Sequence, residues 1–190
     1  MYIGEIFNKS FNFPIENRLS IIIGMNGTGK TLALRKLKEY FEQNNENVVY
    51  FPEPEKRILY GDPQEIKTIL HNNFDLELLN PENTIKNNFN MAYLNYAIDN
   101  IENYLNDYID SGYIQIINFL YHILRAEKES IILIDTPETN FDIIVQHNLL
   151  DYILSLCTVK KLIVCTHSPS IINNNWDSSI VEIENCIKLY

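Results

Sequence analysis

The chain has 190 residues, of which 46% are hydrophobic and 21% charged, a composition typical of a folded globular protein. Disordered and fibrous classes are excluded, and the length suits one domain with room for one inserted subdomain. The formal net charge of -10 argues against direct DNA binding by one subunit, because such binding needs Lys and Arg to neutralise phosphates. Any contact with nucleic acid is therefore expected to be indirect.

The N-terminal segment "MYIGEIFNKS" has no basic start followed by a long apolar core, and no run approaches the roughly 18 apolar residues of a membrane span. Cys157, Cys165 and Cys186 stand at no metal-like spacing, and the first two lie in apolar stretches, as reduced cytosolic thiols do. We expect a soluble cytoplasmic protein with no membrane partner.

Apolar runs and helical patterns alternate along the chain. Three runs, "LSIII", "IILI" and "KLIVC", are typical of strands buried on both faces of a parallel sheet under helices. The fold class is therefore predicted as α/β. The predicted elements are strands over 2–7, 19–23, 48–51, 131–135 and 161–165, helices over 30–43, 112–126 and 143–156, and a terminal pair near 179–184 and 186–190.

The middle of the chain, residues 53–110, departs from that alternation. A loop-like stretch, "PEPEKRILYGDP", precedes apolar residues at helical spacing. We predict a helical lobe inserted into a single domain that spans residues 1–190. Its aromatic residues are expected to serve packing; they are Phe89, Tyr93, Tyr96, Tyr104 and Tyr108.

The segment "GMNGTGKT", residues 24–31, fits the P-loop pattern G-x-x-x-x-G-K-[ST] between a predicted strand and a predicted helix. Its glycines let backbone N–H groups turn toward phosphate oxygens, and the helix adds the positive end of its dipole. Lys30 is expected to bridge the terminal phosphates, and the Thr31 hydroxyl to hold Mg²⁺. The alternative is a glycine-rich turn with an exposed lysine. The residues expected to bind nucleotide are Gly24, Asn26, Gly27, Thr28, Gly29, Lys30 and Thr31.

Two further polar residues follow predicted strands. Asp135 ends "IILI", where its carboxylate can reach the Mg²⁺ shell; without a P-loop it would be interpreted as a strand-end residue before Pro137. His167 follows "KLIVC" at a strand's carboxyl end, where open parallel sheets bind ligands. A lone histidine is usually structural, but beside phosphate and magnesium a γ-phosphate sensor is favoured.

The segment "DSGYIQIINFLYHIL", residues 110–124, begins a predicted amphipathic helix. Ser111 is a good N-cap residue, and capping alone would explain it. Ser111 and Gly112 at a helix start also form an exposed anion site that could close on the nucleotide of another subunit.

In this order, "GMNGTGKT", "DSGYIQ", "IDTPETNFDIIVQ" and "CTHSPS" resemble the motifs of ATP-binding-cassette (ABC) ATPases, in particular the compact SMC, RecF and OLD-like branch. The resemblance implies a P-loop NTPase fold, with ATP and Mg²⁺ as cofactors. It implies a head-to-tail homodimer, with each ATP between one subunit's P-loop and the other's Ser111-Gly112. It also assigns residues: Lys30, Asp135, Glu138 and His167 to catalysis, and Thr31 and Asp135 to the metal.

The chain departs from the family pattern at several positions. Thr136 stands where the family has its catalytic glutamate, and residues 141–143 replace "LHP". The signature is reduced to one Ser-Gly followed by Tyr113, and the Q-loop glutamine has only Gln64 as a distant candidate. Because a threonine cannot accept a proton near neutral pH, we expect slow hydrolysis, with Glu138 or a partner-supplied group as the alternative base.

Three hypotheses follow. The favoured one is an ABC-type ATPase or switch that works through a partner protein such as a nuclease, in DNA repair or antiphage defence. A P-loop small-molecule kinase is disfavoured, because the predicted lobe offers only Arg57 where such enzymes use several lid arginines. The third is an ATP-binding regulatory or interaction module that does not hydrolyse ATP.

Overall fold

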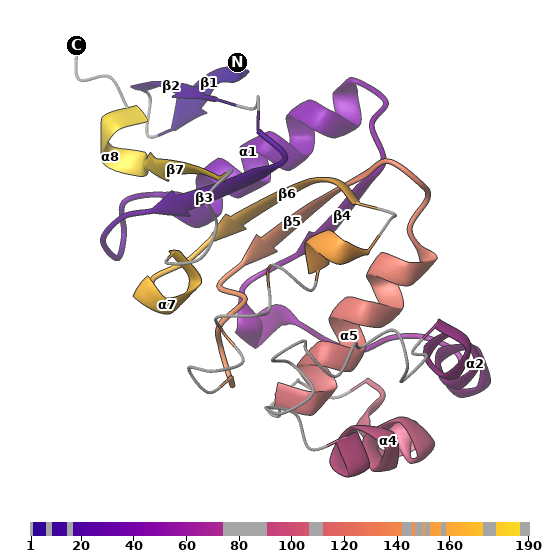
Figure 1. Ribbon diagram of the computed structural model, residues 1–190. Helices are drawn as coiled ribbons and strands as arrows, with labels where there is room; N and C mark the ends of the chain where they lie inside the picture. The colour runs from indigo at the N-terminus through magenta and orange to yellow at the C-terminus, as the bar shows by residue number, and fades with distance from the viewer. Residues whose placement is uncertain are drawn as a thin grey trace.

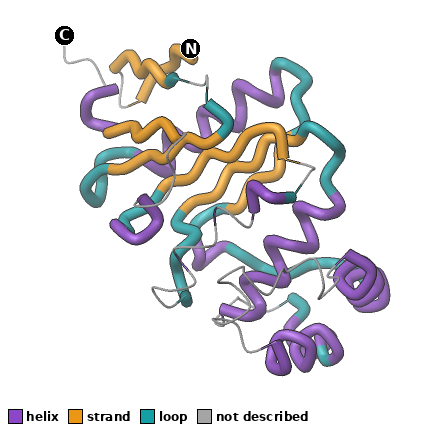
Figure 2. Tube along the Cα trace, in the orientation of Figure 1, coloured by secondary structure: helices purple, strands orange, loops and turns teal. Residues whose placement is uncertain are grey.

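The computed structural model describes residues 2–6, 9–14, 17–73, 91–106, 112–141, 146, 150, 153–156, 159–172 and 178–186. A five-stranded parallel sheet forms the centre, in the order β4-β5-β6-β3-β7 (Figures 1 and 2). Its strands are β3 (Leu19–Ile23), β4 (Val48–Phe51), β5 (Ser130–Asp135), β6 (Val159–Cys165) and β7 (Ser178–Glu182).

Helices cover both faces of this sheet (Figure 1). The helix α1 (Lys30–Gln43) packs on one face through Leu34 and Leu37, against strand residues such as Ile22. The helix α5 (Gly112–Arg125) packs on the other face through Phe119. Alternate residues of β3, β4, β5 and β6 enter opposite clusters, and this explains why these strands are apolar on both sides.

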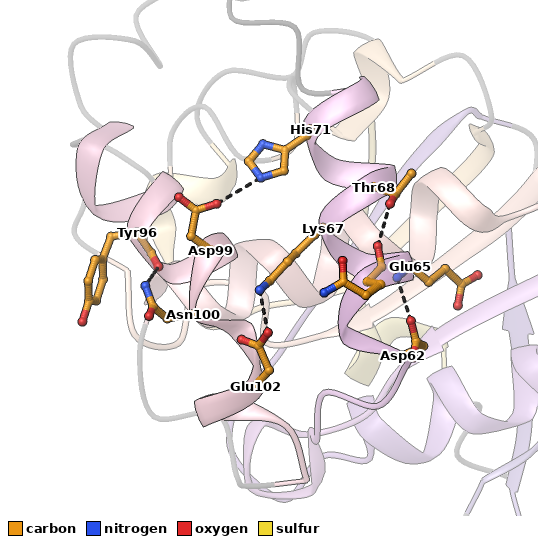
Figure 3. Close-up of polar contacts among 10 residues, drawn as sticks. Asp62, Glu65, Lys67, Thr68, His71, Tyr96, Asp99, Asn100 and Glu102 are labelled. Carbon is orange, nitrogen blue, oxygen red and sulfur yellow. Dashed lines mark hydrogen bonds and ion pairs between the residues drawn. The ribbon is translucent and has the colours of Figure 1, made fainter.

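Among the described residues between β4 and α5 stand four short helices: η1 (Pro54–Lys56), α2 (Pro63–Asn73), α4 (Met91–Asp99) and η2 (Ile101–Tyr104). With the outer side of α5, the helices α2, α4 and η2 enclose a third buried cluster, which includes Leu70 and Ile98. Polar contacts join these helices at the surface: a Lys67–Glu102 ion pair at 2.6 Å and a hydrogen bond between His71 and Asp99 at 3.2 Å (Figure 3). Most of the burial here is apolar, and exposed pairs of this kind add little stability.

Most element predictions are confirmed. The helix over 30–43 and the strands over 19–23 and 48–51 have the predicted bounds, and the other central strands differ by at most two residues at an end. Within the predicted helix 143–156, the described residues 146, 150 and 153–155 are helical, Leu156 lies in a bend, and the others lie outside the described residues.

Two element predictions need correction. The segment after the first strand, for which no element was predicted, contains a strand, β2 (Lys9–Phe13), which pairs antiparallel with β1 (Tyr2–Ile6) in a separate two-stranded sheet. Aromatic residues alternating with polar ones fit such a pairing, but the polar residues hid it. The last predicted strand, 186–190, begins in a helix, α8 (Ile183–Cys186), and residues 187–190 lie outside the described part. None of the described helices combines the length and apolar character needed to cross a membrane.

Candidate functional site

The parallel order of the sheet brings four loops to one edge, at the carboxyl ends of β4, β5, β6 and β3. A cavity of about 480 Å³ opens there, the usual position for a ligand in such a sheet. Its described lining is Asn26, Gly27, Gly29, Lys30, Thr31, Leu32, Arg35, Glu53, Pro54, Glu55, Asp135, Thr136 and His167. The cavity therefore contains residues from each strand end that the sequence analysis singled out, together with several that it did not.

The loop between β3 and α1 depends on glycine at two points. Gly29 has φ of 98°, in the left-handed region, and directly precedes α1. At Gly24 a Cβ would lie 2.5 Å from the Ile183 side chain and 2.8 Å from the Glu184 carboxylate, so α8 leaves no room for a side chain. The carboxylate of Glu184 also accepts a 3.0 Å bond from the Met25 N–H. The C-terminal segment thus helps to shape the loop.

The Lys30 ammonium lies across this loop. Its Nζ donates to the carbonyl oxygens of Gly24 and Met25, both at 2.8 Å, and only 6% of the residue is exposed. Burial lowers the Lys30 pKa, while nearby acids, Glu184 and Asp135 among them, oppose that shift. The lysine is therefore a cation held at the cavity wall, in a position to meet a phosphate.

Thr31 and Asp135 come from different elements, the start of α1 and the end of β5, and both line the cavity. Asp135 is 3% exposed, and burial raises its carboxyl pKa, although the Thr31 hydroxyl and the nearby cations oppose that shift. Its Oδ2 is buried without a hydrogen-bond partner among the described residues. A buried carboxylate oxygen without a partner is unfavourable by itself, and a bound cation would satisfy it.

The Mg²⁺ that accompanies ATP in P-loop proteins fits these residues. Among the described residues, no group of three or more His, Cys, Asp or Glu could hold a metal unaided. Magnesium does not need such a cage, since it usually keeps several waters and takes one or two protein ligands plus phosphate oxygens. Thr31 and Asp135 would be those ligands.

Glu138 and His167 lie close together on neighbouring loops. The backbone N–H of His167 donates to Glu138 Oε1 at 2.9 Å, and Glu138 Oε2 is buried without a partner among the described residues. The His167 side chain is exposed and lines the cavity, while Glu138 is not in the described lining. Thr136 lines the cavity with φ of 51°, a conformation rare for a β-branched residue.

The proposed signature residues are only partly described. Ser111 lies outside the described residues, and Gly112 is the first residue of α5. A Cβ on Gly112 would lie 2.5 Å from the carbonyl oxygen of Asn140, so close packing alone accounts for this glycine. Its expected role in a second subunit's nucleotide site stays a prediction.

Sequence reasoning missed four charged residues: Arg35, Glu53 and Glu55 in the described cavity lining, and Glu184 beside the P-loop. Glu53 lies two residues beyond the end of β4, while Asp135 is the last residue of β5. Glu53 Oε1 pairs with Arg35 at 2.6 Å, and its Oε2 is buried without a partner in the described structure. The position of Glu53 just beyond an apolar strand was a usable signal. Glu184 gave none, because only the fold brings α8 to the loop. Gln64, the candidate Q-loop residue, lies in α2 and outside the described lining.

Comparisons with known proteins place this geometry in a structural class. No family model matches the sequence, and no curated protein sequence matches it. Among solved structures, the chain is similar to an ABC transporter ATP-binding protein from Pyrococcus furiosus, with a TM-score of 0.55 and 15% identity over 98% of this chain and 96% of the other. It is also similar to a nucleotide-free ATP-binding cassette from an ABC transporter, with a TM-score of 0.52 and 13% identity over 95% and 85%.

The fold is therefore that of an α/β P-loop NTPase of the ATP-binding-cassette type, as the resemblance of the motifs predicted. At these identities the likeness concerns the fold alone. The narrower SMC, RecF and OLD-like branch remains a prediction.

Proposed function

We propose that this protein is a Mg-ATP-binding ABC-type ATPase or ATP-gated switch, which dimerises around ATP and acts through a partner protein. The observation that carries the proposal is the cavity itself. Lys30 and Thr31 of the P-loop share its lining with Asp135 and His167, from two other strand ends. When bound, Mg²⁺ would neutralise phosphate charge and bridge phosphate oxygens, and Thr31 and Asp135 are placed to hold it.

The organisation proposed is one ATPase domain over residues 1–190, with residues 53–110 as an inserted helical lobe. The separate apolar cluster among α2, α4, η2 and the outer side of α5 supports the lobe. Dimerisation rests on the resemblance of "DSGYIQ" to the family signature, with Ser111 and Gly112 expected to face the nucleotide of the other subunit.

Slow hydrolysis is part of the proposal. The cavity residue next to Asp135 is Thr136, whose hydroxyl can orient water but cannot take its proton near neutral pH. Glu138 is the nearest alternative, and one of its oxygens already accepts the His167 N–H. The other alternative is a general base supplied by a partner protein. A long-lived ATP-bound state would suit a switch.

The placement of Arg57 does not favour the kinase alternative. Lid arginines of a kinase face the transferring phosphoryl group, yet Arg57 is 1% exposed and bonded to backbone carbonyls. The described residues that the proposed lobe contributes to the cavity are Glu53, Pro54 and Glu55, two of them acidic.

The biological process is proposed from the resemblance alone. It points to DNA repair or antiphage defence, with a partner such as a nuclease and indirect contact with nucleic acid. The net charge of -10 supports the indirect contact, because an acidic surface repels phosphates.

Calorimetric titration with Mg-ATP tests the binding proposal. Removing the Lys30 ammonium should weaken affinity by about 10- to 100-fold, since a hydrogen bond to a charged group is worth about 1.5–3 kcal/mol. Lys30→Ala is the test variant. Lys38→Ala is the matched control, because Lys38 lies on the same helix and pairs at 2.7 Å with Glu42.

Equal affinity in the wild type and Lys30→Ala would contradict the proposal, whereas a loss confined to Lys30→Ala supports it. Repeating the titration with EDTA in place of Mg²⁺ should weaken binding further, because Thr31 and Asp135 then have no cation to share with the phosphates.

A further inference from the structure

Two buried polar side chains form hydrogen bonds to the turn after β5, which is defined here as residues 135–139. Arg57 is 1% exposed and Gln115 is fully buried, and neither belongs to the described cavity lining. Arg57 follows the short helix η1, while Gln115 lies in the first turn of α5. Segments distant in the sequence therefore meet at the turn that carries Asp135 and Thr136.

Arg57 binds the first half of the turn. Its Nη2 donates to the carbonyl oxygens of Asp135 and Thr136, the latter at 3.0 Å. Its Nε donates to the Pro52 carbonyl at 2.9 Å, and the guanidinium lies 5.3 Å from the centroid of the Phe119 ring. The same side chain thus also holds the segment that leaves β4 and touches the middle of α5.

Gln115 binds the second half. Its Nε2 donates to the carbonyl oxygens of Pro137 at 3.2 Å and Thr139 at 2.7 Å. Its Oε1 accepts a 2.7 Å bond from Nη1 of Arg57, so the two side chains are joined. Together they bind the carbonyls of four of the five residues in the turn. Gly112, one helical turn earlier, lies against the carbonyl of Asn140.

Burial of the charged Arg57 guanidinium beside this turn is unfavourable by itself. Burial lowers the pKa of Arg57 to about 10, although Asp135 and Glu138 stabilise its charge, so the guanidinium remains charged at neutral pH. Buried ionic groups can often be replaced by apolar residues without loss of stability. What an apolar residue would not supply is a rigid fork of donors that fixes several carbonyl oxygens in one geometry.

We propose that Arg57 and Gln115 are positioning residues, which lock the turn after β5 to the start of α5 so that neither can move without the other. The proposal rests on the proposed function. Thr136 and Glu138 then keep their places beside the nucleotide only while α5 keeps its orientation. The end of α5 expected to face a second subunit is thereby mechanically tied to the residues expected to act on water.

Single-turnover hydrolysis and ATP titration should be compared in the wild type, Arg57→Lys, Arg57→Met and Gln115→Met. None of the described hydrogen bonds of Arg57 and Gln115 goes to residues 24–31, so Mg-ATP affinity should stay within about threefold, less than a lost hydrogen bond to a charged group would cost. The hydrolysis rate should fall by about 10- to 100-fold, as expected when reacting groups are misplaced. Arg57→Lys should recover part of the rate, since it keeps the charge and some donors.

Leu70→Ala is the matched control for stability, because Leu70 is fully buried among the helices between β4 and α5 and touches neither partner. Should Arg57→Met fail to fold, Gln115→Met and Arg57→Lys carry the test. Hydrogen exchange gives a second measurement: amides of residues 131–139 should exchange faster in Gln115→Met, while those of residues 19–31 should not change.

Equal rate losses in Leu70→Ala and Gln115→Met, or uniform acceleration of exchange, would show a general structural role and overturn the inference. Wild-type rates in all Arg57 and Gln115 variants would also overturn it. A wild-type protein that does not bind Mg-ATP would instead defeat the proposed function, and the exchange experiment would still decide whether the turn is locked.

Discussion

At the scale of single residues, Thr136 is the departure from the family pattern that most directly affects the geometry of the cavity. It lines the cavity beside Asp135, adopts φ of 51°, and donates its N–H to the Cys165 carbonyl at 2.8 Å. Its own carbonyl accepts from Arg57. A β-branched residue in this conformation costs roughly 1–3 kcal/mol, which surrounding contacts must offset. The turn is therefore rigid, and any side chain at position 136 is attached to a backbone of fixed conformation.

Thr136→Glu should hydrolyse ATP faster than the wild type in single-turnover assays, because it adds a carboxylate where Thr136 meets the cavity. A positioned base contributes about 10² to 10⁴ in rate, which sets the upper limit of the gain. Thr136→Gln has a similar size without a base and is the control.

Glu138→Gln tests the alternative base in the same assay. We expect a small effect, since one Glu138 oxygen is already bonded to the His167 N–H. If the wild type turned over at about 1 s⁻¹ or faster, within the usual enzyme range, and Glu138→Gln abolished the reaction, Glu138 would be the base and slow hydrolysis would be wrong.

At the scale of elements, the start of α5 is where a helix meets the turn of a strand. Gly112 has a φ outside the left-handed region, so its backbone would accept any residue, and only the nearby Asn140 carbonyl excludes a side chain. The segment after β5 and the start of α5 are therefore in close contact at Gly112. Glycine is required there because it has no side chain, not because its backbone is flexible.

Gly112→Ala should destabilise the protein by about 1–3 kcal/mol, as overpacking usually does. Helix propensity alone would favour alanine by up to about 1 kcal/mol, so a net loss identifies the contact with Asn140 as its cause. Urea unfolding measures the change; a variant as stable as the wild type or more so would show that α5 can move away from the turn.

At the scale of the whole molecule, the described cavity contains both cationic and acidic residues. The residues expected to complete the nucleotide site belong to another subunit. In solution, a slowly hydrolysed ATP analogue should double the mass measured by light scattering, while ADP should not. Ser111→Arg should abolish the doubling, because a large side chain would block the expected approach of the second nucleotide.

Lys30→Ala is the control for that experiment, since it should remove dimerisation by weakening binding and not by blocking the surface. A monomer that persists with saturating analogue would contradict the homodimer and would favour a different chain as the partner.

Much of this fold was predictable from the sequence, because its signals are local. Strands buried on both faces must be apolar throughout, as "IILI" and "KLIVC" are, and a P-loop needs glycines and a lysine at fixed spacing. Those constraints predicted the parallel sheet and placed Lys30, Thr31, Asp135 and His167 at strand ends. The β2 pairing was missed because the polar residues Lys9, Ser10 and Asn12 hid the alternation that is typical of a strand.

Tertiary structure alone decided which distant residues complete the site. The order β4-β5-β6-β3-β7 puts Glu53 beside Asp135, and α8 brings Glu184 to Met25 of the P-loop, more than 150 residues away in sequence. The sequence shows Arg57 as an ordinary surface cation, yet its guanidinium is buried against the carbonyls of the turn after β5. Such contacts have no local sequence signal, because backbone carbonyls are the same at every residue and only packing determines which ones a side chain reaches.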